Sequence, residues 1–599
     1  MKDRKDVSVE ETWDLSLIFK TVEEFEEKLK LVINLGQEFY EKYFNNLKNA
    51  KDVENSLSKI SEIYKLIDKL SAYASLAVEA DTLDDEANVR YQKMRAVLSR
   101  VFANFSFFDN ALLSLDENIL KELGNHKEYG RTIKKVLSKK PYALSNDVEK
   151  SLSILSNTLD FPYQLYNDTK FRDIKFPDIK VNEKTYPMTY NNFEGHLEMD
   201  DDKDLRREAF KVFSENLRKY QYTTASTYNA QVQKEKQLAD LRGYKTVFDY
   251  LLHEQEVSME MYNRQIDVIM TELAPHMRKY ATLLKKIHNL EEIRYSDLKI
   301  EVDPTYSPDL TYDEAKKYVL EGLSVLGEDY LSIMKNAFDN RWIDYAENKG
   351  KRTGAFCSTP YGVNAFVLMS FNNKMNEVMT LAHELGHAGH FVLAGQNQNI
   401  LNTDCSMYFV EAPSTTNELI VENYLLDQAK DDKRLKRWVL SQIVSKTYYH
   451  NFVTHFMEAA FQREVYKLVD AGEFLDADKL NEIFLTKLKE FWGEEIVFDD
   501  GAELTWMRQP HYYMGLYPYT YSAGLTIGTQ VAMKIRQNRE ESKNWIEVLK
   551  LGGSFTSEEL AKKAGVDIST DKPLKDTIAY IGSLIDEIEE ISIHLGEIC

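Results

Sequence analysis

The sequence predicts a mainly α-helical protein with more than one lobe. Glycine and proline are scarce, at 24 and 12 of 599 residues, which favours long helices over a turn-rich β architecture. Apolar residues recur at three- and four-residue steps over residues 21–157 and again over 203–293, as amphipathic helices require. A chain of this length is too long for one small core, so we expect two or more lobes.

The first lobe is predicted to consist of successive amphipathic helices. From Val53 to Leu70, for example, apolar side chains keep helical spacing and charged residues lie between them. Pro141 interrupts this series, since proline cannot continue the backbone hydrogen bonding of a helix.

A domain boundary is predicted at the acidic cluster of residues 200–202. From residue 161 onward, prolines accompany short β-prone runs, and residues 179–186 are predicted to form a hairpin. The acidic cluster then leads into a new helical run. We therefore expect an amino-terminal helical lobe over residues 1–199, with a short β-like segment near its end, and a second domain over residues 200–599.

The second domain is expected to be helical around one small sheet. Thr311 and Glu314 fit a capping box at the start of a helix. Residues 354–372 differ from their surroundings, because they are aromatic and β-prone. We predict that they form strands of a small sheet just before a helix over residues 376–391.

The helix predicted over residues 376–391 carries an H-E-x-x-H motif formed by His383, Glu384 and His387. Residues four apart on a helix lie one above the other, so the two imidazoles can share one metal ion. Glu384, one step round the helix, can hold a metal-bound water without becoming a ligand. Di-iron bundles also use the overlapping Glu-x-x-His spacing, but they need a second such pair, and this chain offers only other spacings. A zinc site is therefore predicted.

A hydrolytic zinc site needs a third protein ligand and an open fourth position. Glu411 is predicted as that ligand, just ahead of Pro413 at the expected start of the next helix. A carboxylate at a helix start is also a common structural cap. Because the H-E-x-x-H motif lies nearby in the sequence, we predict that Glu411 is a metal ligand instead. Glu418, seven residues on, shares the same face and can orient a ligand, although a solvated or packed role fits it equally.

Three further histidines are predicted to be structural. His390 falls on the same face as His383 and His387, but one turn too far along to reach the same ion. His450 and His455, five residues apart, are expected on different faces of a helix.

Composition excludes several classes of function. The net charge of −22 argues against nucleic acid, because phosphate binding needs a basic face. Cys357, Cys405 and Cys599 make no disulfide framework. The amino terminus shows no apolar segment of signal-peptide length, and no run of about 18 apolar residues occurs. We therefore expect a soluble, cytoplasmic protein without a membrane partner, and the oligomeric state stays open.

Three motifs together resemble oligoendopeptidase F, within the thimet oligopeptidase-like zinc metallopeptidases. They are the H-E-x-x-H helix, the segment 409–414 around Glu411, and the tyrosine-rich stretch 511–521, in this order. The first motif alone occurs in many peptidase families, whereas the three in order are specific, and the likeness covers nearly the whole chain. It implies a mostly helical fold of two lobes flanking a deep substrate channel, and a zinc metallopeptidase domain over residues 200–599.

By this resemblance, His383, His387 and Glu411 are the zinc ligands and Glu384 is the catalytic glutamate. The implied activity is zinc-dependent hydrolysis of internal bonds in short, unstructured oligopeptides. Zinc lowers the pKa of a bound water from 15.7 to about 7, and Glu384 accepts its proton and passes it to the leaving amine. We also expect the substrate to pair with the aromatic strand near residues 365–371 by β-addition.

The same resemblance assigns donors that stabilise the oxyanion to His511 and to a tyrosine of the following stretch. Tyr517, Tyr519 and Tyr521 all lie near the expected positions, and Tyr517 is the first choice and Tyr521 the second. Tyr519 is predicted to belong to the packed core.

Two other functions stay open. A metallocarboxypeptidase would need a group that recognises the free carboxylate of its substrate, and Arg352 and Arg508 are the candidates. A non-catalytic helical binding protein would be expected to lose Glu384 or His511, and both are present.

Overall fold

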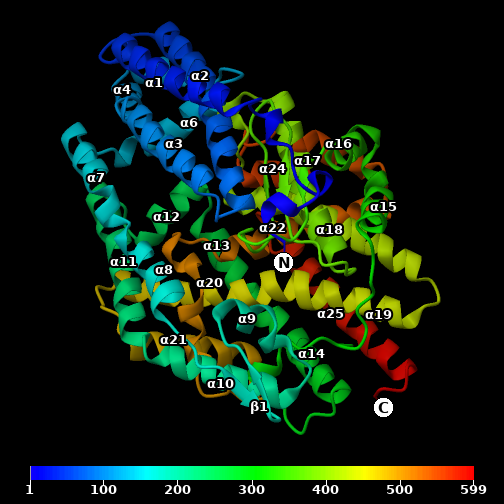
Figure 1. Ribbon diagram of the computed structural model, residues 1–599. Coiled ribbons are helices and arrows are strands. Elements are labelled where there is room, and N and C mark those ends of the chain that lie inside the picture. The colour runs from blue at the N-terminus through cyan, green and yellow to red at the C-terminus, as the bar shows by residue number, and fades with distance from the viewer. Residues whose placement is uncertain (1, 599) are drawn as a thin grey trace. The chain divides into compact units, whose positions relative to one another are not determined.

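A computed structural model of the protein describes residues 2–598 (Figure 1). Helices hold 70% of the residues and strands 3%, and the strands form two small sheets. The prediction of a mainly helical chain with a small sheet is therefore confirmed. Among the described residues, no helix combines the length and the apolar character that crossing a membrane requires.

The chain divides into two compact units, each assembled from three stretches of sequence. The first unit comprises Met1–Asp147, Pro308–Val421 and Val531–Val566. The second unit comprises Val148–Ser307, Glu422–Gln530 and Asp567–Cys599. The boundary expected near residue 200 concerns domains along the sequence and stays a prediction.

Helices supply most of the first unit. They are α1 (Val22–Tyr43), α2 (Ala50–Ala80), α3 (Asp85–Ala103), α4 (Phe108–Leu113), α5 (Glu117–Leu123), α6 (Gly130–Lys139), α15 (Tyr312–Leu323), α16 (Glu328–Asp339), α17 (Glu377–Asn397), α23 (Glu541–Leu549) and α24 (Ser557–Lys563). In Figure 1, α1, α2 and α3 lie side by side, and their apolar faces share one hydrophobic core. The amphipathic helices predicted before Pro141 are confirmed.

A three-stranded sheet lies beside α17 in the first unit. Its strands are β3 (Ile343–Asp344), β4 (Phe356–Ser358) and β5 (Phe366–Leu368). Strand β5 is central, parallel to β3 and antiparallel to β4. Phe366 and Leu368 of β5 are fully buried in the same core as α1 to α3. The sheet predicted just before the H-E-x-x-H helix is confirmed, although β3 was not anticipated.

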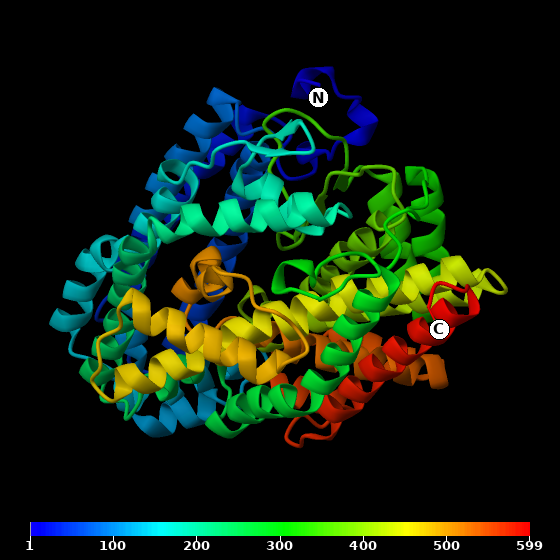
Figure 2. The ribbon, with the colours of Figure 1, turned by 90° about the horizontal axis from the view of Figure 1, so that it is seen from below.

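Helices also build the second unit, together with one hairpin. They are α8 (Phe161–Asp168), α9 (Tyr190–Gly195), α10 (Lys203–Arg218), α11 (Gln221–Arg242), α12 (Val247–Gln255), α13 (Met259–Val268), α14 (Ala274–Ile287), α19 (Lys433–Gln442), α20 (His455–Asp470), α21 (Ala477–Trp492) and α25 (Lys572–His594). Helix α25, red in Figures 1 and 2, packs along α14 and α19. Three helices continue across unit boundaries: α7 (Asn146–Leu159), α18 (Met407–Ala429) and α22 (Tyr519–Gln537).

Two local predictions are confirmed. The predicted hairpin consists of β1 (Ile179–Val181) and β2 (Lys184–Tyr186), and both turn residues between them have positive φ, as a type I′ turn requires. Helix α15 begins at the predicted capping box, in which Thr311 and Glu314 each bind the backbone N–H of the other.

Candidate metal centre

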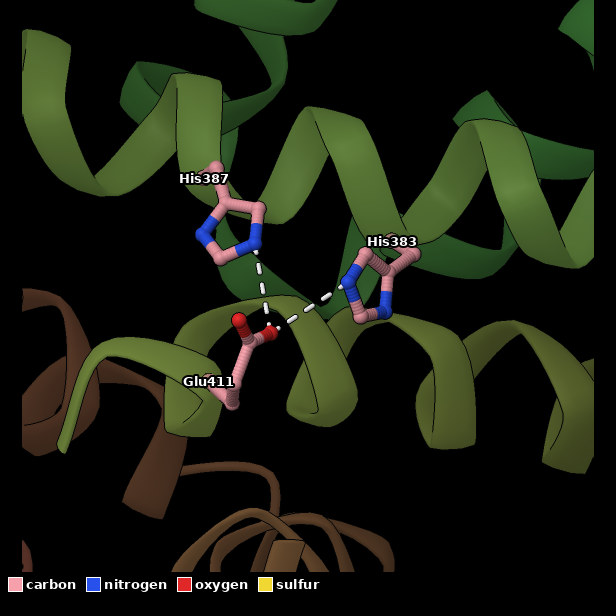
Figure 3. A group of neighbouring side chains, drawn as sticks. All are labelled: His383, His387 and Glu411. Atoms are coloured by element: carbon pink, nitrogen blue, oxygen red, sulfur yellow. Dashed lines mark ion pairs between the residues drawn. The ribbon is translucent and has the colours of Figure 1, made fainter. Parts of the chain in front are cut away.

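Helix α17 presents the two motif histidines on one face. His383 and His387 are one turn apart, and their ring centroids are 5.2 Å from each other. Apolar residues on the remaining faces of α17 are buried, which fixes the rotation of the helix about its axis. Both imidazoles therefore point away from the core and toward the neighbouring helix α18 (Figure 3).

Glu411 comes from α18, and this helix begins earlier than predicted. We expected Glu411 at its start, whereas α18 begins at Met407 and Pro413 lies inside it. A proline at this depth removes one backbone hydrogen bond. The Thr415 hydroxyl donates to the carbonyl oxygen of Glu411, at 2.6 Å, and the Ser414 hydroxyl lies 2.8 Å from its carboxylate. These hydroxyls fix Glu411 within the helix.

Three donor atoms converge in the way a tetrahedral metal requires. Nε2 of His383 and Nε2 of His387 each lie 3.3 Å from Oε2 of Glu411 (Figure 3). Two ligand atoms bound to one zinc at about 2.0–2.1 Å with tetrahedral angles are about 3.3 Å apart. Two imidazole nitrogens and one carboxylate oxygen are also a common zinc donor set. The predicted ligands are therefore brought together with a spacing that fits a zinc ion.

Glu418 orients His383 in the structure. Its Oε2 accepts a hydrogen bond from Nδ1 of His383 at 3.1 Å. When His383 is neutral, this bond places its proton on Nδ1 and leaves the Nε2 lone pair facing Glu411. Metal-binding histidines usually have such a carboxylate partner, so the orienting role fits Glu418 better than a solvated one.

The electrostatics of the centre favour a cation. Burial opposes charge on His383, but hydrogen bonds to Glu411 and Glu418 outweigh it and raise the pKa of His383 well above its usual value. Burial likewise opposes charge on Glu411, but His387 and His383 hold the pKa of Glu411 well below its usual value. The carboxylate of Glu411 therefore stays ionised and makes a site that attracts positive charge.

Glu384 lies on the side of α17 that faces β4. The residue is 6% exposed, and its Oε2 is buried with no hydrogen-bond partner among residues 2–598. Burial raises the pKa of Glu384. The charges of Glu411 and Glu418 raise it further, whereas the charges of His383 and His387 lower it. Burial raises the pKa of the Cys357 thiol on β4, and the charge of Glu384 adds to this effect. A buried carboxylate with a free oxygen and a raised pKa suits a proton acceptor.

Gly386 permits the close approach of α17 and α18, a role that we did not predict. A Cβ at this position would lie 2.5 Å from Cα of Ser414 and 2.7 Å from the carbonyl oxygen of Pro413. Both are backbone atoms and cannot move aside as a side chain would. The small residue inside the H-E-x-x-H motif is therefore required for Glu411 to reach the two histidines.

Gly386→Ala should push the two helices apart. We expect the variant to lose about 1–3 kcal/mol of stability, the usual cost of overpacking, and to bind zinc more weakly. Gly395→Ala on the same helix is the matched control, because the nearest atom to its Cβ is 4.0 Å away. Thermal unfolding and zinc titration of both variants measure these effects. Equal zinc affinity in the two variants would show that the close approach is unimportant.

One expectation about the sheet is wrong. We expected a peptide to pair with the strand near residues 365–371, but β5 is already paired with β3 on one edge and β4 on the other. A central strand has no backbone groups left for another chain. The outer edge of β4 is the edge left for pairing with a peptide. The N–H of Val367 donates toward β3, so Val367 and the residue opposite it on β4, Cys357, are not hydrogen-bonded to each other. The backbone N–H and C=O of Cys357 therefore point away from β5.

The predicted distal histidine belongs to a separate cluster within the second unit. Nδ1 of His511 donates to Oε2 of Glu458 at 2.9 Å, and Nδ1 of His455 donates to Oε1 at 3.1 Å. Burial alone would raise the pKa of Glu458, but His455 and His511 outweigh it and lower the pKa to about 2. The carboxylate of Glu458 thus stays ionised between two imidazoles. Sequence reasoning missed Glu458, although it lies three residues after His455 on α20.

The predicted tyrosines lie around His511 in different ways. The Tyr521 hydroxyl is 3.4 Å from Nε2 of His511, and its ring stacks on His455. The Tyr517 ring lies 5.3 Å from that of His511 and 5.2 Å from that of Tyr521. Tyr519 is 1% exposed and donates to Gln255, so its predicted place in the core is confirmed.

His450 and His455 lie on the same face, and the prediction of different faces is wrong. Their Nε2 atoms are 3.0 Å apart. Between α19 and α20 the chain forms two π-helical turns, Ile443–Tyr448 and His450–Thr454. Hydrogen bonds from i to i+5 widen the turn, and this brings residues five apart above one another.

His390 and the two candidate arginines lie in surroundings that do not suggest ligand recognition. His390 is fully buried against Phe391, and burial lowers its pKa to about 3, so it stays neutral. Arg352 pairs with Glu79, at 2.8 Å. Arg508 is buried and pairs with two glutamates, at 3.0 and 3.1 Å. Each arginine thus already holds a carboxylate of this chain.

Comparisons with known proteins identify a family and a fold for the chain. The sequence model of the family Peptidase family M3 matches residues 196–580 of this chain. The sequence model described as Oligopeptidase F matches residues 112–176. Oligopeptidase PepF of Bacillus subtilis is 29% identical, over 99% of this chain and 88% of its own length. The crystal structure of a putative peptidase from Chlamydophila abortus has a TM-score of 0.87 at 21% identity, covering 98% of this chain and all of that one. Oligoendopeptidase-F from Enterococcus faecium has a TM-score of 0.73 at 22% identity, covering 96% and 98%.

Proposed function

The chain belongs to peptidase family M3, and from this premise we propose that it is a zinc-dependent endopeptidase acting on short oligopeptides. The observation that carries the proposal is the convergence of His383, His387 and Glu411 on one point, with Glu384 beside them. The cytoplasmic location expected from the sequence stays a prediction.

His383, His387 and Glu411 would hold the zinc ion. When bound there, zinc supplies Lewis acidity toward a carbonyl oxygen and acidifies a water ligand. Glu418 keeps His383 in the tautomer that offers Nε2. Gly386 keeps α18 close enough for Glu411 to complete the set. These positioning contacts support a site built in advance of substrate binding.

Glu384 would move the proton. Its carboxylate accepts a proton from the attacking water and then delivers it to the nitrogen of the leaving amine. The buried surroundings of Glu384 support this role, because they raise the pKa of the carboxyl and so make the carboxylate a stronger proton acceptor. Few bulk waters compete for the proton, because Glu384 is 6% exposed.

His511, Tyr517 and Tyr521 are proposed as donors to the oxyanion that forms when water attacks the peptide carbonyl. Support comes from the order of the three motifs and from the partner of His511. The hydrogen bond from Nδ1–H to Glu458 orients the ring, and Nε2 is the nitrogen of His511 left to face an oxyanion. Tyr521 supports the arrangement through the 3.4 Å approach of its hydroxyl to Nε2.

His511→Ala should lower turnover by about 10² to 10³, the usual cost of losing one oxyanion donor, while zinc content and KM change little. Tyr517→Phe and Tyr521→Phe test which hydroxyl acts, since each removes only one oxygen. Tyr519→Phe is the matched control in the same stretch. Steady-state kinetics with metal analysis give the answer, and a His511→Ala enzyme with normal kcat would remove His511 from the mechanism.

The substrate is proposed to pair with the outer edge of β4, in place of β5. The support is the register of the sheet, which directs the backbone N–H and C=O of Cys357 outward. Pairing through backbone groups accepts many side chains, as a peptidase of broad range requires. Glu384 is near this edge, since its charge reaches the Cys357 thiol.

Short peptides are proposed as substrates, supported by the names oligopeptidase and oligoendopeptidase that the relatives carry. A folded protein would first have to unfold, at a cost of about 5–15 kcal/mol. We expect rapid cleavage of a ten-residue peptide blocked at both ends, at internal bonds only, and little action on unfolded casein at equal mass. Mass spectrometry of the products decides, and rapid breakdown of intact casein would refute the size limit.

A metallocarboxypeptidase is the second candidate, and the blocked peptide separates it from an endopeptidase. Removing single residues from a free carboxyl terminus requires recognition of that carboxylate. Both candidate arginines already pair with glutamates of this chain. A carboxypeptidase would leave the blocked peptide intact, whereas an endopeptidase would cut it.

A further inference from the structure

A sizeable cavity adjoins the metal helix within the first unit. Its volume is about 480 Å³, within the usual range for ligand pockets of about 300–1,000 Å³. The walls come from α2, α3, the connection between β4 and β5, the second half of α17, and the segment that follows it. None of the roles discussed above uses this cavity.

The cavity begins about one helical turn from a metal ligand. Phe391 lines it and lies four residues after His387, hence on the same face and about 6 Å further along α17. Thr359, one residue after β4, lines it from the other side. An extended peptide advances about 3.3–3.6 Å per residue, so a side chain about two to four residues from the cleaved bond reaches the cavity.

Two carboxylates supply the charge of the cavity, and the described lining contains no lysine, arginine or histidine. Asp68 lies one turn after Tyr64 on α2, and its Oδ2 accepts the N–H of Tyr361 at 2.6 Å. Asp404 lies close enough for its charge to act on Asp68. Neither aspartate forms an ion pair with a basic side chain in the part of the chain that the structure describes.

The surroundings of the two carboxylates favour a cationic group. Burial raises the pKa of both Asp68 and Asp404, and the nearby charges of Lys69 and Lys135 do not offset it. A cation that entered the cavity would stabilise the ionised form of the two carboxylates, which burial disfavours. The Tyr361 ring of the wall already has the Lys65 ammonium group 4.9 Å from its centroid, so further attraction to a cation would come from the other aromatic rings of the lining.

We propose that this cavity is a subsite that binds a positively charged group of the peptide substrate, a lysine or arginine side chain or a free amino terminus. The proposal rests on the proposed peptidase function and adds a preference to it. The cation would lie between Asp68 and Asp404, while the scissile bond lies at the metal centre one turn away along α17.

The test compares peptides that differ only in one charge. Blocked neutral decapeptides carry a single lysine at each position in turn, and matched peptides carry acetyl-lysine there. At one position we expect the ratio of kcat/KM for lysine over acetyl-lysine to reach roughly 10- to 100-fold, the usual effect of hydrogen bonds to a charged group. A second set with a free amino terminus and acetyl-lysine shows whether the terminus can supply the cation.

Variants identify the cavity as the source of the preference. Asp68→Asn and Asp404→Asn, singly and together, should bring the ratio toward one. Glu62→Gln is the matched control on α2, because Glu62 is exposed and outside the cavity, and it should keep the ratio. Constant ionic strength keeps long-range attraction by the net charge of −22 equal in all assays. That general attraction would favour lysine equally at every position.

Two results would overturn the inference. One is a wild-type ratio within about twofold of one at every position and at the amino terminus; the other is an undiminished ratio in the double variant. Either result leaves the peptidase function intact, since the peptides are still cleaved. Failure to cleave any peptide would instead contradict the proposed function itself.

Discussion

His387→Ala is expected to remove the metal and to reduce peptide hydrolysis to background. The variant loses one of three protein ligands. The two ligands that remain are too few to hold the zinc ion. Zinc content should fall from about one per chain to near zero, as measured by atomic absorption after dialysis. His383→Ala should behave alike, because its Nε2 occupies the equivalent position 3.3 Å from Glu411.

His390→Leu is the matched control for the histidine variants. His390 lies on the same helix, is fully buried, and has no hydrogen-bond partner for either ring nitrogen among the described residues. A leucine of similar volume should keep both zinc and activity. Loss of zinc from this control together with its retention in His387→Ala would show that the donor set is wrong.

Glu384→Gln is expected to keep the metal and lose turnover. The amide has the same shape as the carboxylate but cannot accept the proton, so kcat should fall by about 10² to 10⁴, the range for a lost general base. Zinc content and thermal stability should stay close to those of the wild type. Single-turnover kinetics on a blocked peptide separates the chemical step from product release.

Glu377→Gln is the matched control for this second prediction. Glu377 lies on the same helix, and burial raises its pKa to about 7. It is therefore a buried glutamate with a raised pKa, like Glu384, but it does not lie beside the candidate metal ligands. The control should retain normal turnover. A Glu384→Gln enzyme with near-normal kcat would contradict the assigned proton transfer whatever its zinc content.

The fold class and the meeting of the three candidate ligands could be predicted because their causes are local. Helical spacing of apolar residues fixed the rotation of α17, and the four-residue interval then placed His383 and His387 on one face. Glu411 needed the resemblance as well, since a glutamate near a helix start has other common roles. The start of α18 was misplaced because Pro413 resembled a helix-start signal, whereas hydroxyl groups let the helix include it.

Other features depend on distant parts of the chain and could not be predicted. Gly386 matters because of the backbone of residues 413 and 414, which no helical pattern reveals. The pairing of β5 on both edges depends on β3, a strand of two residues without a sequence signature. His450 and His455 meet because the helix between them is π-helical, and spacing rules assume α-helical turns.

The central claim is that the zinc held by His383, His387 and Glu411 is required for peptide hydrolysis. The most direct measurement is cleavage of a blocked decapeptide by protein that has been treated with a chelator, before and after zinc is added back. We predict no cleavage by the metal-free protein and full recovery at about one zinc per chain. Undiminished cleavage by protein shown to contain no metal would contradict the claim.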